Sequence, residues 1–250
     1  MSEAILTGSD LRKVFNGTVA VDDASFAVEA KTITAIIGPN GAGKTTLFNL
    51  ITGFLSPDRG EIRFRGKALN GTPPHEIARR GISRTFQDLR LIRQISVRDN
   101  LRLANPNQKH EEFWYALFKR KGEAEGRAME ATLRLLGFGS LLPLYDELAG
   151  NLSYGQQKLL TLFCCLATQS EILLLDEPVA GVHPDVASEI LQHLRQLKEQ
   201  GRTVVFIEHD IEAVRSVADQ VIVMDHGKTI ASGPKDEVLS KSEIVEAYLT

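Results

Sequence analysis

Long hydrophobic runs and cysteines are scarce in this chain of 250 residues. The longest apolar stretch, residues 159–167, is far shorter than the roughly 20 residues that a membrane-spanning helix requires. The two cysteines, Cys164 and Cys165, are adjacent, which is the spacing of neither a zinc site nor a disulfide framework. We expect them to be buried apolar side chains without chemistry. These absences argue against an integral membrane protein and against a fold held together by disulfides.

An excess of positive charge and a signal sequence are missing as well. The 29 basic residues are outnumbered by 32 acidic ones, so the net charge of -3 gives no basic surface for nucleic acid or an anionic membrane. The first ten residues contain acidic side chains and lack the basic start and apolar stretch of a signal peptide. We therefore expect a cytoplasmic protein that binds no nucleic acid.

The composition that remains is that of an ordinary globular protein. With 43% hydrophobic and 24% charged residues, a chain of this length can bury a substantial core. Neither an internal repeat nor a linker rich in proline and glycine divides it. Residues 1–250 are therefore predicted to form a single unit.

The order of the predicted elements indicates an α/β fold. The middle of the chain, residues 97–136, is rich in Arg, Lys, Glu, Leu and Ala and is predicted to be helical. In the last third, strands and helices alternate, which predicts a mostly parallel sheet with the helical middle inserted into it. The predicted strands are 11–15, 19–28, 32–37, 61–64, 172–175, 203–207 and 221–224, and the predicted helices are 44–51, 184–200 and 211–218.

A glycine-rich loop follows the predicted strand 32–37. Residues 38–45 read Gly-Pro-Asn-Gly-Ala-Gly-Lys-Thr and fit the phosphate-loop pattern GxxxxGK[ST] between a strand and a helix. Its glycines allow successive backbone N–H groups to point at phosphate oxygens, and the next helix adds its positive N-terminal end. A glycine turn that binds nothing would leave the Lys-Thr pair unexplained.

Within this loop, Lys44 is predicted to reach the β- and γ-phosphates of ATP, and Thr45 is predicted to bind Mg²⁺. The residues predicted to contact the nucleotide here are Gly38, Pro39, Asn40, Gly41, Ala42, Gly43, Lys44, Thr45 and Thr46.

Two carboxylates follow a second apolar strand. Four apolar residues, 172–175, precede Asp176 and Glu177, which suits a central strand that delivers its acids to the carboxyl edge of the sheet. Asp176 is predicted to hold Mg²⁺, and Glu177 is predicted to accept a proton from the attacking water. Taken alone, the pair could also be a solvated acidic turn.

Two further polar residues follow predicted strands. Gln87 comes after the segment 82–86, and His209 comes after strand 203–207. Either could hold water or magnesium near a γ-phosphate, although a lone Gln or His is more often a surface residue. Their interpretation therefore depends on the motifs around them.

Residues 152–157, Leu-Ser-Tyr-Gly-Gln-Gln, resemble the signature sequence of ABC-transporter ATPases. The succession of phosphate loop, Gln87, signature, Asp176-Glu177 and His209 also resembles this family over nearly the whole chain. The resemblance implies an α/β phosphate-loop core with a mostly parallel sheet, an N-terminal antiparallel β subdomain and a helical subdomain inserted at about residues 88–165.

The family resemblance also implies partners and site roles. Two cassettes, identical or different, would pack head to tail, with each ATP between the phosphate loop of one and Ser153, Gly155 and Gln156 of the other. Two transmembrane permease subunits would bind the pair, and a solute-binding protein would act indirectly. By the same resemblance, Gln87 and His209 are catalytic residues near Mg²⁺ and the γ-phosphate. Phe15 would stack on adenine, the alternative being a core aromatic.

One position departs from the family pattern. Many members place an Asp after a Ser-Ala-Leu sequence beyond the catalytic Glu, whereas this chain has His183 there, which we expect to be an interface or surface residue. Residues 113–118 contain an aromatic cluster at helical spacing, for which packing inside the helical subdomain is favoured over a docking face.

The variants Thr85-Phe86-Gln87, the signature and the C-terminal residues 242–249 look like those of ATPase subunits of branched-chain amino-acid importers. Related subunits that import urea, amides or other amino acids are the alternative. An ABC-type ATPase outside transport usually has long coiled coils or two cassettes in one chain, and a GTPase has an Asn-Lys-x-Asp motif. None of these features occurs here. The predicted function is therefore a Mg-ATPase that resides at the inner face of the membrane through its permease partners.

Overall fold

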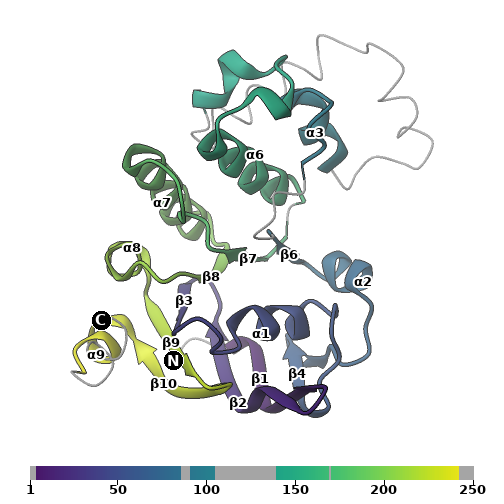
Figure 1. Ribbon diagram of the computed structural model, residues 1–250, viewed down its shortest axis with the longest axis vertical. Coiled ribbons are helices and arrows are strands. Elements are labelled where there is room, and N and C mark those ends of the chain that lie inside the picture. The colour runs from purple at the N-terminus through teal and green to yellow at the C-terminus, as the bar shows by residue number, and fades with distance from the viewer. Residues whose placement is uncertain (1–3, 86–90, 105–138, 169, 242–250) are drawn as a thin grey trace.

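The computed structural model describes residues 4–85, 91–104, 139–168 and 170–241. These residues form a six-stranded sheet, a four-stranded sheet and the helices that surround them (Figure 1). Within these ranges no helix is long and apolar enough to span a membrane.

The four-stranded sheet is antiparallel and comes from the N-terminal part of the chain. Its strands are β1 (Ala4–Phe15), β2 (Thr18–Glu29), β4 (Arg59–Phe64) and β5 (Lys67–Ala68), in the order β2-β1-β4-β5. Strand β1 begins seven residues earlier than the predicted start at Leu11, because Ile5 and Leu6 are buried and Leu6 pairs with both neighbouring strands. The antiparallel β subdomain predicted from the family resemblance is confirmed.

The six-stranded sheet forms the core of the molecule. Its order is β10-β9-β3-β8-β7-β6, and every neighbouring pair is parallel except β10 with β9. All five residues of β3, of β7 and of β8 are buried, as expected for strands covered on both faces. The prediction of a mostly parallel sheet is confirmed. The strands are β3 (Ile33–Ile37), β6 (Ile82–Arg84), β7 (Ile172–Asp176), β8 (Thr203–Ile207), β9 (Gln220–Asp225) and β10 (Lys228–Pro234).

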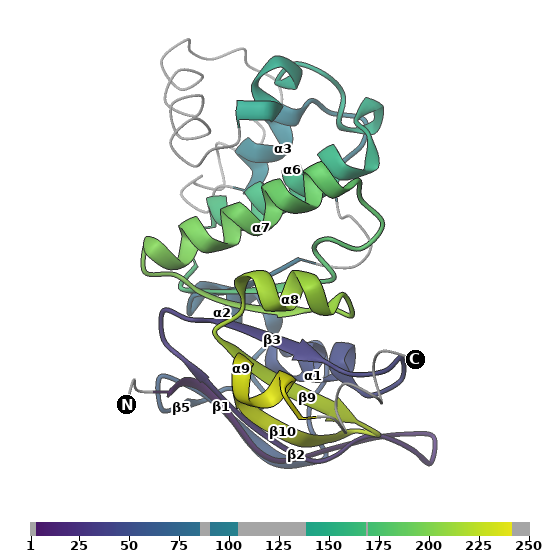
Figure 2. The same ribbon diagram turned by 90° about the vertical axis from the view of Figure 1, so that its left-hand side faces the viewer.

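The two faces of this sheet are covered differently. One face packs on α1 (Lys44–Ile51) and on the antiparallel sheet, and the other packs on α6, α7 and α8, as Figure 2 shows from the side. Helices α3 and α6 lie together above α7, at the end of the molecule away from the antiparallel sheet (Figure 1). The remaining helices are α2 (Pro74–Arg79), α3 (Val97–Ala104), α6 (Tyr154–Ala167), α7 (Pro184–Glu199), α8 (Ile211–Val217) and α9 (Lys235–Leu239), with short 3₁₀ turns at Gly139–Leu144 and Ala149–Asn151.

Parts of the helical prediction lie outside the described residues. The segment 97–136 is helical in α3, and its remaining part from residue 105 lies outside, as do the aromatic cluster 113–118 and the C-terminal residues 242–249. Cys165 is buried as expected, whereas Cys164 is only partly buried. Burial raises the pKa of both thiols to about 12, in keeping with cysteines that do no chemistry.

Candidate active site

The phosphate loop connects β3 to α1 at the carboxyl edge of the six-stranded sheet. A side chain at Gly38 would place its Cβ 2.1 Å from the Met224 carbonyl oxygen, and one at Gly43 would lie 2.4 Å from the Ala20 carbonyl oxygen. Both glycines also have positive φ angles, 151° and 95°. Only glycine therefore fits, and the bare backbone leaves a cradle in front of α1, whose first N–H groups have no acceptor in their own helix.

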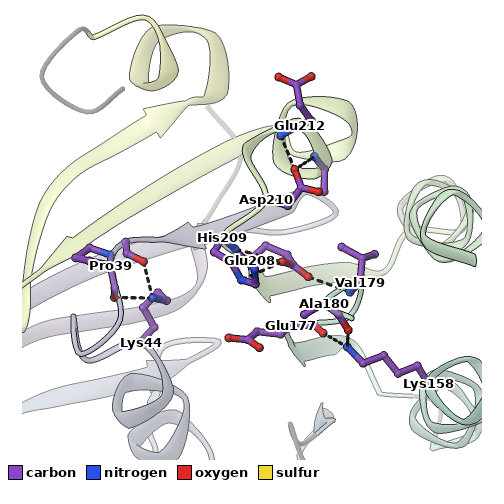
Figure 3. Close-up of polar contacts among 12 residues, drawn as sticks. Pro39, Lys44, Lys158, Glu177, Val179, Ala180, Glu208, His209, Asp210 and Glu212 are labelled. Atoms are coloured by element: carbon purple, nitrogen blue, oxygen red, sulfur yellow. Dashed lines mark hydrogen bonds and ion pairs between the residues drawn. The ribbon is translucent and has the colours of Figure 1, made fainter. Parts of the chain in front are cut away.

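Lys44, the first residue of α1, lies over this loop. Its Nζ donates hydrogen bonds to the carbonyl oxygens of Gly38, at 2.6 Å, and Pro39, at 2.9 Å (Figure 3). Burial lowers the pKa of Lys44, and the negative charges of Glu177 and Asp176 oppose this shift. The Lys44 ammonium group therefore interacts electrostatically with both carboxylates at the carboxyl edge of the sheet.

Asp176 ends β7, and its carboxylate is buried in an ion pair. Its Oδ2 accepts a hydrogen bond from Nη2 of Arg84 at 2.8 Å, and the two side chains are only 3% and 4% exposed. Its backbone N–H donates to Oγ1 of Thr85 at 3.2 Å, and Arg84 also donates to Oδ1 of Asn49 in α1 at 2.6 Å. Sequence reasoning missed Arg84, and it named Thr85 only as part of the variant Thr85-Phe86-Gln87, without a contact to Asp176. The available signal was an arginine inside a short, otherwise uncharged strand segment.

Glu177 lies in a left-handed turn after β7. Its φ angle is 49°, an uncommon conformation for a residue with a side chain, and its N–H donates to the Ile207 carbonyl oxygen at 3.0 Å. The Glu177 carboxylate points toward the side of the site where Lys44 lies (Figure 3). The predicted acidic pair is thus divided, with one carboxylate buried beside Arg84 and the other presented to the phosphate loop.

Two charged residues that the sequence analysis did not single out surround this turn. Lys158 of α6 donates to backbone carbonyl oxygens on one side, and Glu208, which is fully buried, accepts the Val179 N–H at 2.9 Å on the other. Burial lowers the pKa of Lys158 and raises the pKa of Glu208, while their mutual attraction opposes both shifts. A carboxylate directly after the apolar strand 203–207 was the signal for Glu208.

His209 follows Glu208 at the end of β8, the neighbour of β7 in the sheet. Its side chain is 63% exposed, and its Nδ1 lies 3.8 Å from Oε2 of Glu208. The next residue, Asp210, caps α8 by accepting the N–H groups of Glu212 and Ala213. His209 is therefore on the same edge as Asp176 and Glu177, with an exposed ring, whereas Gln87 lies outside the described residues.

The signature residues form the N-terminus of α6. The Ser153 side chain accepts the Gln156 N–H, and the Gln156 side chain accepts the Ser153 N–H, which together make a capping box. A Cβ at Gly155 would lie 3.1 Å from the Val186 side chain of α7, so the two helices approach closely there. Within the described part of the chain, no hydrogen bond joins Ser153, Gly155 or Gln156 to the phosphate loop.

Phe15 and His183 are both at the surface. Phe15 is 39% exposed and has the Lys13 ammonium 5.7 Å from its ring centroid, so the alternative of a core aromatic is wrong. His183 caps α7 by accepting the Asp185 N–H, and its side chain is 73% exposed, as expected for a surface or interface residue.

The residues at the sheet edge fit a magnesium nucleotide. In the ranges that the structure describes, no three His, Cys, Asp or Glu side chains gather into a metal site of their own. Magnesium in nucleotide sites is usually held by one or two protein oxygens together with phosphates and water. The hydroxyl of Thr45 and the carboxylate of Asp176 are the predicted donors of that kind here.

Comparisons with known proteins agree with this geometry. Residues 21–180 match the family model described as ABC transporter. The chain is 38% identical to the high-affinity branched-chain amino acid transport ATP-binding protein BraF of Pseudomonas aeruginosa, covering 100% of this chain and 99% of that one. It is 36% identical to the corresponding protein LivG of Escherichia coli K12, with the same coverage.

Solved structures give the same result. A nucleotide-free ATP-binding cassette from an ABC transporter has a TM-score of 0.84 and 36% identity over 99% of this chain and 100% of that one. An ADP conformation of such a cassette has a TM-score of 0.82 at 36% identity, covering 99% of both chains. The fold, the phosphate loop and these similarities together show that the chain belongs to the ABC transporter family and binds nucleotide.

Proposed function

We propose that this chain is the ATP-hydrolysing subunit of an importer for branched-chain amino acids. The observation that carries the ATPase role is that the phosphate loop after β3, with Lys44 over it, and the acidic end of β7, with Asp176 and Glu177, lie at the same carboxyl edge of the parallel sheet. The substrate class is supported by the relatives named for branched-chain amino acid transport, which match over nearly their full length.

In the proposed reaction, the loop amides and Lys44 bind the β- and γ-phosphates. Thr45 and Asp176, assisted by Gln87, hold Mg²⁺, which supplies charge neutralisation at the phosphates when bound. A water attacks the γ-phosphorus, its proton passes to Glu177, and the bond from that phosphorus to the bridging oxygen breaks, which releases ADP and phosphate. His209 is proposed to contact the γ-phosphate beside Glu177, and Phe15 to stack on adenine.

A second cassette completes the proposed site. Ser153, Gly155 and Gln156 lie at a helix N-terminus, where free N–H groups suit a phosphate, and they do not reach the phosphate loop of their own chain. We propose that these residues of one cassette bind the ATP held by the other. This arrangement fits a dimer of this chain or a pair with a related subunit.

The permease subunits are proposed to dock in a groove between α2 and the α3–α6 pair. The groove has a volume of about 510 Å³ and is lined largely by apolar atoms, with Phe54, Ile92 and Leu103 among its residues. Arg84 and Thr85 also line it, and both contact Asp176. A permease bound there would place the chain at the inner face of the membrane and in contact with the magnesium carboxylate.

The proposed roles predict a specific behaviour for Glu177→Gln. The amide cannot accept the proton of water, so we expect ATP binding close to that of the parent and turnover reduced at least about 100-fold. ATP should convert this variant into a stable dimer that gel filtration separates from the monomer. Lys44→Ala, which removes the phosphate-binding ammonium, should bind ATP too weakly to dimerise. Turnover of Glu177→Gln near the parent rate would exclude its role as the base.

The solute is tested by uptake of labelled leucine. Cells that lack this gene and any redundant carrier should lose uptake, and the unmutated chain but not Glu177→Gln should restore it. Unchanged leucine uptake on deletion would leave the ATPase assignment standing but exclude branched-chain amino acids as the transported solute. Uptake of urea, amides and other amino acids would then be screened.

A further inference from the structure

The turn after β7 carries the proposed base in a conformation that needs support. Glu177 has a φ angle of 49°, and Gly181, four residues later, has one of 71°. A left-handed residue with a side chain costs of order 1 kcal/mol or more and persists only when its surroundings hold it. The turn makes one weak internal backbone hydrogen bond, from the Ala180 N–H to the Glu177 carbonyl oxygen at 3.4 Å. Its conformation therefore depends on contacts from other elements.

Lys158 supplies the closest of these contacts. Its Nζ donates to the carbonyl oxygen of Glu177 and to that of Ala180, both at 2.6 Å, so that one ammonium group joins the start and the end of the turn (Figure 3). The Lys158 side chain is buried, and its Nζ lies 5.3 Å from the ring centroid of Tyr154, one helical turn earlier. Charged donors form stronger hydrogen bonds than neutral ones, and these two hydrogen bonds of the buried Lys158 ammonium lie largely out of water.

The opposite side of the turn is fixed by Glu208. Its Oε1 accepts the Val179 N–H at 2.9 Å, and its Oε2 accepts the His209 N–H at 3.2 Å. Figure 3 shows the Lys158 amine and the Glu208 carboxylate approaching the turn from different elements. Two carbonyl oxygens of the turn thus accept hydrogen bonds from Lys158 of α6, and the Val179 N–H of the turn donates to Glu208, which directly follows β8.

The position of Lys158 along its helix gives this contact a second consequence. Ser153 caps the same helix, and five residues of α-helix span about 7.5 Å of rigid backbone. Lys158 therefore connects the helix end that carries the signature residues to the turn that carries Glu177 in the same chain. Tyr154 strengthens this connection, since its ring lies against Gly181 of the turn, 3.5 Å from where a Cβ would be.

We propose that Lys158 is a positioning residue that holds the Glu177 turn against α6, so that the helix carrying Ser153 also sets the position of the Glu177 carboxylate. The proposal rests on the proposed role of Glu177 as the base. In the proposed reaction Lys158 contacts neither the nucleotide nor the attacking water. It acts through two backbone carbonyls.

The first test compares Lys158→Met with Lys158→Arg in steady-state ATP hydrolysis. Methionine keeps the length and the apolar packing but donates no hydrogen bond, so we expect kcat to fall about 10- to 100-fold as the base loses its position. KM should stay within about threefold, because the phosphate cradle is untouched. Arginine can donate to both carbonyls and should restore most of kcat. Lys198→Met is the matched control, since Lys198 of α7 pairs with Asp219, between α8 and β9, and its loss should leave kcat unchanged.

The second test measures hydrogen exchange in the nucleotide-free protein and does not depend on ATPase activity. Loss of the Lys158 contacts should speed exchange of the Val179 and Ala180 amides in Lys158→Met and leave α1 unchanged. In a Glu177→Gln background, ATP-driven dimerisation should slow exchange of these amides, and the addition of Lys158→Met should abolish that slowing. Should Lys158→Met not fold, Lys158→Leu, which also donates no hydrogen bond, takes its place under the same expectations.

Three results would overturn the proposal. Unchanged kcat in Lys158→Met excludes a positioning role, and unchanged amide exchange excludes the contact that the role needs. An equal loss of kcat in Lys158→Arg and Lys158→Met would assign the effect to packing alone. Absence of ATP hydrolysis by the parent chain would instead overturn the proposed function, while the exchange experiment on the nucleotide-free protein would still decide whether Lys158 holds the turn.

Discussion

The buried pair Arg84–Asp176 allows a quantitative prediction about stability. Both side chains are at most 4% exposed and their nearest charged atoms are 2.8 Å apart. Removing one partner of such a pair leaves an uncompensated buried charge and typically costs about 3–5 kcal/mol. Arg84→Met also loses the hydrogen bond to Asn49 and the contact of the guanidinium with the Phe48 ring, 5.3 Å from its centroid. We therefore expect this single change to lower the free energy of unfolding by about 4 kcal/mol.

A double-mutant cycle separates the pair from its surroundings. Asp176→Asn keeps an acceptor oxygen beside Arg84 but removes the charge, and should cost about 2 to 3 kcal/mol. The double variant leaves neither charge behind, so its cost should be less than the sum of the single costs by about 2 kcal/mol. Urea unfolding in buffer without nucleotide or magnesium measures all four free energies, because bound ligand would add its own stabilisation.

The control for this cycle is an ion pair of the same type at the surface. Arg12 and Asp22 are a similar distance apart, 2.9 Å, but their side chains are 43% and 32% exposed, so Arg12→Met should cost less than about 1 kcal/mol. If Arg84→Met costs no more than Arg12→Met, or if the two changes of the cycle add within about 0.5 kcal/mol, the reasoning from burial is refuted.

Two further predictions follow from the phosphate loop and the signature. Gly43→Ala forces a Cβ to within 2.4 Å of a backbone oxygen and should abolish ATP binding in a fluorescent-nucleotide titration. The control Gly66→Ala, where nothing lies within 4 Å, should bind ATP normally and lose about 1 kcal/mol of stability. Normal ATP binding by Gly43→Ala would contradict the proposed phosphate cradle. Ser153→Ala removes the capping box of α6 and should lower Tm by about 2–4 °C in a calorimeter, and an unchanged Tm would show that the cap contributes nothing.

The parts of the fold that the sequence predicted well are those set by local patterns. Helix α1 was predicted with its observed bounds, because a glycine loop precedes it and Gly53, with a φ angle of 72°, follows it. Strands β3, β7 and β8 were found within one residue at either end, since each is a continuous apolar run between turns. Strand β10 was missed because alternate residues are exposed at the edge of the sheet, which leaves no hydrophobic run to read.

The first half of β1 was missed for a different reason. Gly8, Ser9 and Asp10 have low strand propensity, and the register with β2 shifts between Gly8 and Leu11, where Asp10 has a positive φ angle. A bulge of this kind interrupts the pattern of the strand without ending its pairing. Local sequence therefore predicted the strand only from Leu11 onward.

The site divides in the same way. The phosphate loop, Asp176 and Glu177 are recognisable motifs, and the structure places them at one sheet edge as predicted, although their chemical roles stay predictions. Arg84 and Lys158 could not be predicted, because each acts through a contact that exists only after folding. Arg84 is 92 residues from Asp176 in sequence, and Lys158 is 19 residues from Glu177 and joined to its carbonyl rather than to its side chain.

The edge position of β6 has a mechanical consequence. This strand is three residues long and, among the described strands, pairs only with β7, whereas β3, β7 and β8 are each bonded on both sides. Resistance to displacement in a sheet rises with the number of bonded neighbours, so β6 is the most compliant strand of the parallel part. A force applied to β6 by a partner bound in the groove beside it would displace β6 and its Arg84 before it displaced any other strand. This displacement would change the electrostatic field at the Asp176 carboxylate, with which Arg84 forms an ion pair.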